Sequence, residues 1–200
     1  MVNLDGLIVH YDLTQIYGDF ENNASNGSNL GEIGSTYGFS DTSPYKLRGA
    51  FSSGSTESAQ TIHITGLNLN HTFSLSVWLS LLDNSVTRTI FSKDKGIGEN
   101  AGDENLLDVE SRTGMKVAVA MYTGTTDHFT TDINTNGCET SENTIDTISW
   151  FNLYLTLSFD GINTTAEIFV DTISSATCTA SERFLEDRNT YPHAWLFIST

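Results

Sequence analysis

Three aromatic residues are the first candidates for chemistry, because each lies on the outer face of an expected strand. Trp78 belongs to the serine-rich face of segment 73–82 (FSLSVWLSLL), and His10 and Tyr154 lie on comparable outer faces. An aromatic ring with amide and hydroxyl neighbours can bind the apolar face of a sugar. This pattern predicts that Trp78, Tyr154 and His10 bind carbohydrate. The alternative is that Trp78 packs beneath a loop.

Two cysteines offer a second kind of chemistry. Cys138 and Cys178 are the only thiols, and neither belongs to a C-x-x-C pair or has a histidine at zinc-ligand spacing. In an oxidising compartment they would pair as a disulfide, which would stabilise the fold by about 3–4 kcal/mol. The alternative is two unrelated thiols.

Asparagines in N-x-S/T triplets form a third group, since such triplets accept N-linked glycans. They occur at Asn23, Asn26, Asn70 and Asn163. Together with the cysteine pair and the scarcity of lysine, these sequons favour an extracellular or cell-surface protein.

The net charge narrows the range of partners. With 25 acidic against 9 basic residues the formal charge is −16, so nucleic acid phosphates and anionic membranes would repel the chain. The charge fits basic partners or divalent cations, and it equally fits simple solubility. No apolar run approaches the roughly 18 residues that span a bilayer, and residues 1–5 do not begin a signal peptide. We expect neither nucleic acid binding nor membrane insertion.

The elements that position these residues are predicted to be strands. Only 2 of the 200 residues are proline, while Gly, Ser, Thr and Asn are abundant, which is typical of short strands joined by polar turns. Alternation of apolar and polar residues predicts about ten strands, at 7–13, 46–51, 61–65, 73–82, 87–93, 106–110, 116–122, 150–159, 165–172 and 194–199. Polar loops are expected at 22–34, 95–103 and 127–145, and the one helical candidate is 181–187.

These strands predict a single all-β domain over residues 1–200, a sandwich or a barrel. The inward faces of the strands supply its core. The expected core residues are Val9, Tyr11, Phe73, Leu75, Val77, Leu79, Phe151, Leu153, Leu155, Leu157 and Phe159, joined by Phe91, Ile168, Val170 and Phe197.

The order of the segments resembles the laminin-G-like and pentraxin-like branch of the concanavalin-A-like jelly rolls. GLIVHYDL (6–13) looks like that family's first strand, and FSLSVWLSLL (73–82) followed by TIFSK (89–93) is similar to its central hairpin. WFNLYLTLSFDG (150–161) followed by AEIFVDT (166–172) resembles a later strand pair with an Asp-Gly turn. The resemblance covers nearly the whole chain and implies an antiparallel two-sheet jelly-roll β-sandwich.

The sequence departs from that family in three places. Thr172 stands where the family has a turn glycine, and Trp150 lies about two residues farther from Asp160 than expected. The family also adds one more strand after the segment corresponding to 194–200, which would leave an unpaired sheet edge here. We expect a domain cut from a larger protein; the alternative is a subunit completed through that open edge by a neighbouring copy or domain.

The resemblance implies calcium as a cofactor, held by loop carboxylates and carbonyls. Asp103, Glu104 and Asn105 lie just before a strand, where pentraxin-like members carry an Asp-Asn pair. The partner ligands of that branch follow the last strand, which this chain lacks. The alternative is a solvated acidic turn.

Some relatives are glycosidases, which use two facing carboxylates. Glu104, Asp108 and Glu110 are the nearest candidates, but their spacing does not match the E-x-D-x-E or E-x-D-x-x-E motif of the glucanases. No serine occupies a G-x-S-x-G elbow either. We therefore expect no enzymatic activity. The predicted function is a binding or adhesion module for a glycan or an extracellular protein, and the alternative is a structural subunit of an extracellular filament or coat.

Overall fold

A computed structural model describes residues 31–33, 38–40, 50–52, 60–65, 72–80, 87–94, 107–123, 126–127, 138–146, 149–180 and 193–198 of the chain. Every regular element within these ranges is a β-strand, and all strand pairs are antiparallel. The all-β prediction is therefore confirmed. No helix in the described part of the chain is long and apolar enough to cross a membrane.

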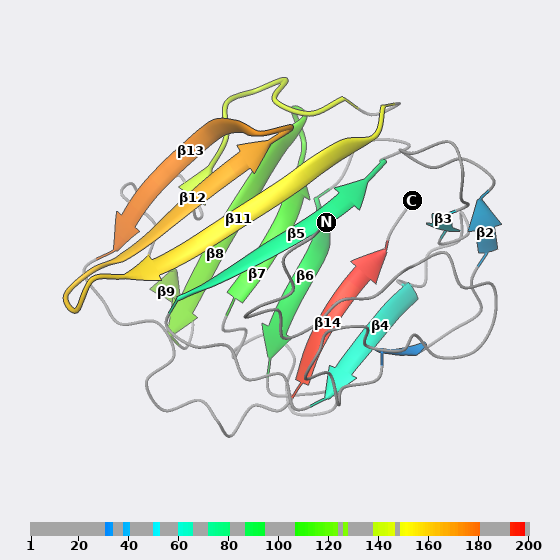
Figure 1. Ribbon diagram of the computed structural model, residues 1–200, viewed down its shortest axis with the longest axis horizontal. Coiled ribbons are helices and arrows are strands. Elements are labelled where there is room, and N and C mark those ends of the chain that lie inside the picture. The colour runs from blue at the N-terminus through cyan, green and yellow to red at the C-terminus, as the bar shows by residue number, and fades with distance from the viewer. Residues whose placement is uncertain are drawn as a thin grey trace, which may run out of the picture.

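One layer is a four-stranded sheet of order β13-β12-β11-β5, which lies at the front in Figure 1. Its strands are β5 (Phe73–Leu79), β11 (Phe151–Phe159), β12 (Thr164–Val170) and β13 (Ile173–Ala180). Leu153, Leu155 and Leu157 of β11 are buried while the residues between them are not, as period-2 alternation requires.

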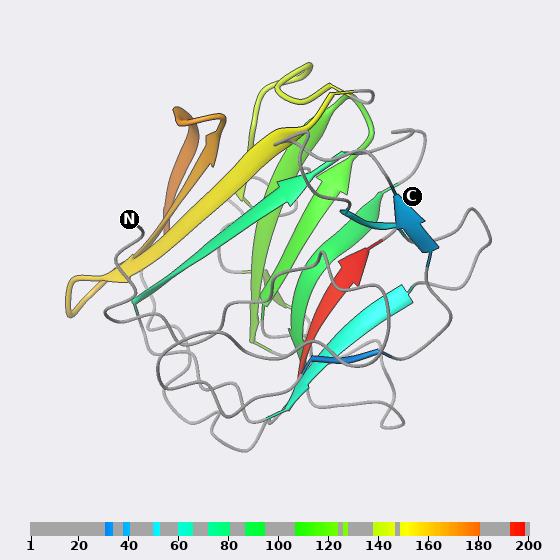
Figure 2. The same ribbon diagram turned by 45° about the vertical axis from the view of Figure 1, so that its right-hand side comes forward.

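The other layer is an eight-stranded sheet of order β1-β4-β14-β6-β7-β8-β10, with β9 paired to β8. Its strands are β1 (Gly31–Ile33), β4 (Gln60–Thr65), β6 (Arg88–Asp94), β7 (Leu107–Arg112), β8 (Lys116–Thr123), β9 (Thr126–Asp127), β10 (Cys138–Glu139) and β14 (His193–Ile198). Two further short strands, β2 (Gly38–Ser40) and β3 (Ala50–Ser52), pair with each other. Figure 2 shows the two large sheets as separate layers.

The core lies between the two sheets. The larger sheet contributes Leu107, Val109, Val117 and Val119, all fully buried, and they pack with the leucines of β11 in one cluster. The two-sheet sandwich expected from the sequence is thus present in the described residues. Ten of the expected core residues belong to this cluster or pack against it, namely Phe73, Leu75, Val77, Leu79, Phe91, Phe151, Leu153, Leu155, Leu157 and Ile168, and Val170 makes an eleventh.

One expectation for the core is wrong, and three lie outside the described residues. Phe159 ends β11 only partly buried and stays outside the core cluster. Val9 and Tyr11 lie outside the described residues, and the side chain of Phe197 does too.

A disulfide joins the two sheets. Cys138 in β10 bonds to Cys178 in β13, with the two Cα atoms 5.6 Å apart. Each cysteine comes from the edge strand of its sheet path, so the bond fastens one side of the sandwich. The predicted pairing of the two cysteines is confirmed.

Five strands were not expected from the sequence. Segment 127–145 was predicted to be irregular, yet β10 lies within it, and β1 lies within the predicted loop 22–34. β2, β9 and β13 had no predicted counterpart at all. These strands are short or rich in serine and threonine, so they lack the apolar alternation that identifies a strand.

The strand predicted at 194–199 is β14, and it lies inside the larger sheet. It is hydrogen-bonded to β4 on one side and β6 on the other. The helix predicted at 181–187 and the strand at 7–13 lie outside the described residues.

Candidate functional site

The outer face of the four-stranded sheet carries an aromatic surface, which we call the aromatic face. It consists of Trp78 on β5, Tyr154 on β11 and Phe169 on β12, with Ser74, Ser76, Asn152, Thr156 and Glu167 between and beside them. All of these residues alternate with the buried positions of their strands, so they point away from the core. The side chain of Trp78 is 40% exposed, whereas a large apolar ring is usually covered in a folded domain.

Strand register places the three rings next to one another. Tyr154 is the direct cross-strand partner of Phe169, and their ring centroids lie 5.6 Å apart at an interplanar angle of 47°. Trp78 pairs with Asn152, two residues before Tyr154 on the same strand. Side chains at such diagonal positions lie about 7–8 Å apart. The rings thus lie on three neighbouring strands, with Trp78 displaced by two residues from the direct Tyr154–Phe169 pair.

Hydrogen bonds fix the polar groups around these rings. The hydroxyl of Tyr154 donates to Ser74 Oγ at 3.2 Å, and Asn152 Nδ2 donates to Ser76 Oγ and to the carbonyl of Val77, both at 3.3 Å. Preorganised amide and hydroxyl groups beside apolar rings suit a ligand that is itself amphipathic.

A surface depression lies beside this sheet, at the turn between β12 and β13. It is lined by Ser141, Thr144, Val170, Asp171, Ile173, Ser174 and Ser175. Ile173 is 68% exposed there, so the depression joins one apolar side chain to several hydroxyl groups.

The turn itself holds two non-glycine residues at positive φ, Asp171 at 48° and Thr172 at 72°. Positive φ at both central residues is the conformation of a type I′ hairpin turn. Asp171 is anchored, because its carboxylate Oδ1 accepts a hydrogen bond from the N–H of Asn152 at 2.8 Å and its own N–H donates to the Asn152 carbonyl at 2.9 Å.

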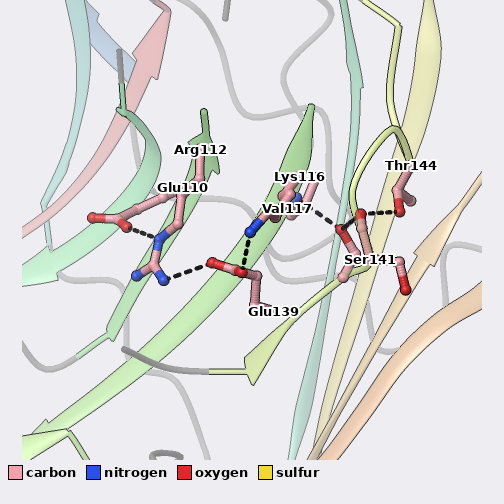
Figure 3. Close-up of polar contacts among 8 residues, drawn as sticks. Glu110, Arg112, Lys116, Val117, Glu139, Ser141 and Thr144 are labelled. Carbon is pink, nitrogen blue, oxygen red and sulfur yellow. Dashed lines mark hydrogen bonds and ion pairs between the residues drawn. The ribbon is translucent and has the colours of Figure 1, made fainter. Parts of the chain in front are cut away.

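The larger sheet carries a separate charged cluster. Arg112 donates to Glu110 Oε2 and to Glu139 Oε2, both at 3.0 Å, and Lys116 donates to Glu139 Oε1 at 2.7 Å. Figure 3 shows Arg112 and Lys116 converging on Glu139 from β7 and β8. The cluster contains two positive and two negative groups, so it joins three strands without adding net charge.

The hydrogen bonds of this cluster affect the pKa values of Glu139, Lys116 and Arg112 more than burial does. Burial acts to raise the pKa of Glu139, but the hydrogen bonds from Lys116 and Arg112 hold that pKa below its ordinary value. The hydrogen bond to Glu139 raises the pKa of Lys116, and burial works against it. Burial likewise works against ionisation of Arg112, yet its two glutamate partners raise its pKa. Glu139, Lys116 and Arg112 all stay charged at neutral pH, because each pKa is shifted in the direction that favours the charged form.

The predicted catalytic candidates fall partly in this cluster. Asp108 and Glu110 pair with Ala120 and Ala118 of β8, and the side chain of Asp108 lies outside the described residues. The carboxylate of Glu110 is engaged by Arg112. Glu104 lies outside the described residues.

The remaining predicted sites divide between described and undescribed residues. Among the carbohydrate-binding candidates, Trp78 and Tyr154 share the aromatic face and His10 lies outside the described residues. The calcium candidates Asp103, Glu104 and Asn105 also lie outside, as do the sequon asparagines Asn23, Asn26 and Asn70.

Of the four asparagines in N-x-S/T triplets, Asn163 is the one that lies within the described residues. It lies partly exposed in the turn between β11 and β12, where its N–H donates to Asp160 Oδ1 at 2.7 Å. The backbone N–H groups of Asn163 and Ile162 lower the pKa of that carboxyl. Across the described residues, no group of three or more His, Cys, Asp or Glu side chains is placed to hold a metal ion.

Sequence reasoning did not identify Phe169, Asn152 or Glu167 as part of a site. The available signal was the alternation in segment 164–170, which puts Glu167 and Phe169 on the face opposite Ile168. Only the register between β11 and β12 brings Phe169 against Tyr154.

Comparison of the chain with protein-family models, with curated proteins and with solved structures finds no match in any of the three. The fold class and the site geometry therefore rest on the chain's own residues, and the laminin-G-like resemblance remains a prediction.

Proposed function

We propose that this protein is a non-enzymatic extracellular binding module that recognises a glycan on the aromatic face. The observation that carries the proposal is Trp78, 40% exposed on a sheet face that also holds Tyr154 and Phe169. An exposed ring of this size loses the free energy that burial would give it, about 1.5–3 kcal/mol for a large apolar side chain. A ligand that covers the ring recovers that free energy.

The chemistry around the rings favours a sugar over a purely apolar ligand. One side of a pyranose ring presents C–H groups that pack on an aromatic face, and its rim presents hydroxyl groups. Asn152, Ser76 and Thr156 lie between or beside the rings and offer donors and acceptors to those hydroxyls.

The finer fold is part of the proposal. The two packed antiparallel sheets and the order of the sequence segments support a laminin-G-like jelly roll. The disulfide between Cys138 and Cys178 is compatible with a secreted protein, because such bonds persist in oxidising compartments.

The test begins with a glycan array probed with the 200-residue chain, followed by titration of a bound glycan with Trp78→Ala. Losing the stacking surface is expected to weaken binding about tenfold, the equivalent of 1.4 kcal/mol. Ile162→Ala is the control, since Ile162 is 74% exposed at the β11–β12 turn, away from the rings. The proposal fails when no glycan binds, or when Trp78→Ala and Ile162→Ala bind with equal affinity.

A further inference from the structure

The four-stranded sheet contains no cationic side chain. Its strands carry neither lysine nor arginine, because the sequence has none between residues 49 and 87 or between residues 117 and 182. Recognition of sulfate, phosphate or carboxylate groups generally uses such cations, above all arginine. The sheet that holds the aromatic face therefore lacks the usual means of binding an anionic glycan.

One acidic side chain, Glu167, does belong to these strands, and it lies on the aromatic face. It pairs with Thr156 of β11 and Thr177 of β13, two residues before Phe169 on the same strand. Ser174 Oγ donates to Glu167 Oε1 at 3.0 Å, which fixes one carboxylate oxygen. A carboxylate accepts about four hydrogen bonds in all, so acceptor capacity remains for hydroxyl groups of a ligand.

We infer that the aromatic face selects neutral glycans against sulfated or sialylated ones, and that Glu167 is a specificity-determining residue in that selection. The inference rests on the proposed function. Glu167 accepts hydrogen bonds from sugar hydroxyls and repels an anionic substituent placed near Phe169. The charge of −16 on the whole chain acts in the same direction, but salt screens that long-range contribution more strongly than the local one.

The experiment measures the affinity of the chain for a neutral oligosaccharide and for its sulfated derivative at about 0.15 M salt, where the Debye length is about 8 Å. At close range in a wet site, repulsion between two unit charges corresponds to roughly a fivefold loss of affinity. We expect the neutral glycan to bind at least fivefold more tightly. Glu167→Gln is expected to close most of that gap, measured as the ratio of the neutral to the sulfated affinity of the same variant.

Glu142→Gln is the charge-matched control, because Glu142 is exposed in the loop after β10 and lies outside the four strands. Equal effects of the two substitutions would overturn the role of Glu167 and assign the selection to net charge. Sulfated glycan bound as tightly as the neutral one would overturn the inference and leave the proposed function standing. Binding of neither glycan, with a glycan array also negative, would overturn the proposed function as well. Thermal melting of each variant shows that the fold is retained.

Discussion

Thr172→Gly is expected to stabilise this protein. Thr172 is a β-branched residue at φ 72°, the second central position of the turn between β12 and β13. In that left-handed region the Cβ atom lies too close to the following carbonyl, and a non-glycine residue loses about 1–2 kcal/mol. The substitution would create an Asp-Gly pair, which type I′ turns prefer.

The expected gain is smaller than the strain it removes. Glycine makes the unfolded chain more flexible, which costs about 0.4–1 kcal/mol. Thr172 is exposed, so little packing is lost with its side chain. The net expectation is a gain of about 0.5–1 kcal/mol, which for a chain of this length raises Tm by roughly 1–4 °C.

The assay is thermal unfolding monitored by circular dichroism, with Thr177→Gly as the matched control. Thr177 is also exposed and lies five residues later in β13, where glycine is expected to destabilise the strand by roughly 0.5–1 kcal/mol. Opposite signs for the two substitutions support the reasoning. A fall in Tm for Thr172→Gly as large as that for Thr177→Gly would refute it, because the left-handed turn would then hold no recoverable strain.

Two further predictions concern the bonds that join strands. Replacing Cys138 and Cys178 together by serine is expected to lower the free energy of unfolding by about 4 kcal/mol on the chain-entropy estimate for a separation of 40 residues, measured by urea denaturation; a loss under 1 kcal/mol would contradict it. Glu139→Gln is expected to cost about 1 kcal/mol at pH 7, since it removes two ion pairs. The pKa of Glu139 is lower in the folded protein than in the unfolded chain, so its ion pairs contribute fully to the free energy of unfolding above the unfolded pKa of about 4.3. That contribution is lost as the pH falls through the folded pKa. The wild-type protein and Glu139→Gln should therefore become equally stable in acid.

The sequence predicted those parts of the fold in which side-chain chemistry follows the strand period. In β5 and β11, apolar residues that face the core alternate with mostly polar or aromatic residues on the outer face, and both strands were predicted close to their observed bounds. β7 and β8 overlap the strands predicted at 106–110 and 116–122, and Gly114 in the turn between them has a positive φ of 85°, which glycine adopts readily.

The strands that the sequence did not reveal are stabilised by their neighbours. β13 (ISSATCTA) is mostly serine, threonine and alanine, and its order comes from pairing with β12 and from the disulfide at Cys178. β10 has two residues and is held by β8. Neither source of order leaves a periodic pattern in the local sequence.

The candidate site was likewise predicted only in part from the sequence. The period of each strand put Trp78 and Tyr154 on outer faces, but their proximity depends on which strands pair and in what register. The register depends on residues far apart in the sequence, because the β5–β11 pairs join residues more than seventy positions apart. Asn152 and Ser76, for example, are separated by 76 positions. Phe169 and Glu167 were missed for this reason.

The disulfide has a consequence for how firmly the strands of this face are joined. Residues 139–177 form a covalently closed loop that contains β11, β12 and most of β13, whereas β5 lies outside it. Trp78 on β5 and Tyr154 on β11 therefore lie on two paired strands that this closed loop does not link covalently, and backbone hydrogen bonds and side-chain packing join the two strands. If the aromatic face binds a glycan as proposed, a glycan stacked on both rings would bridge the two strands, and the amide protons of β5 would exchange with solvent more slowly in the complex.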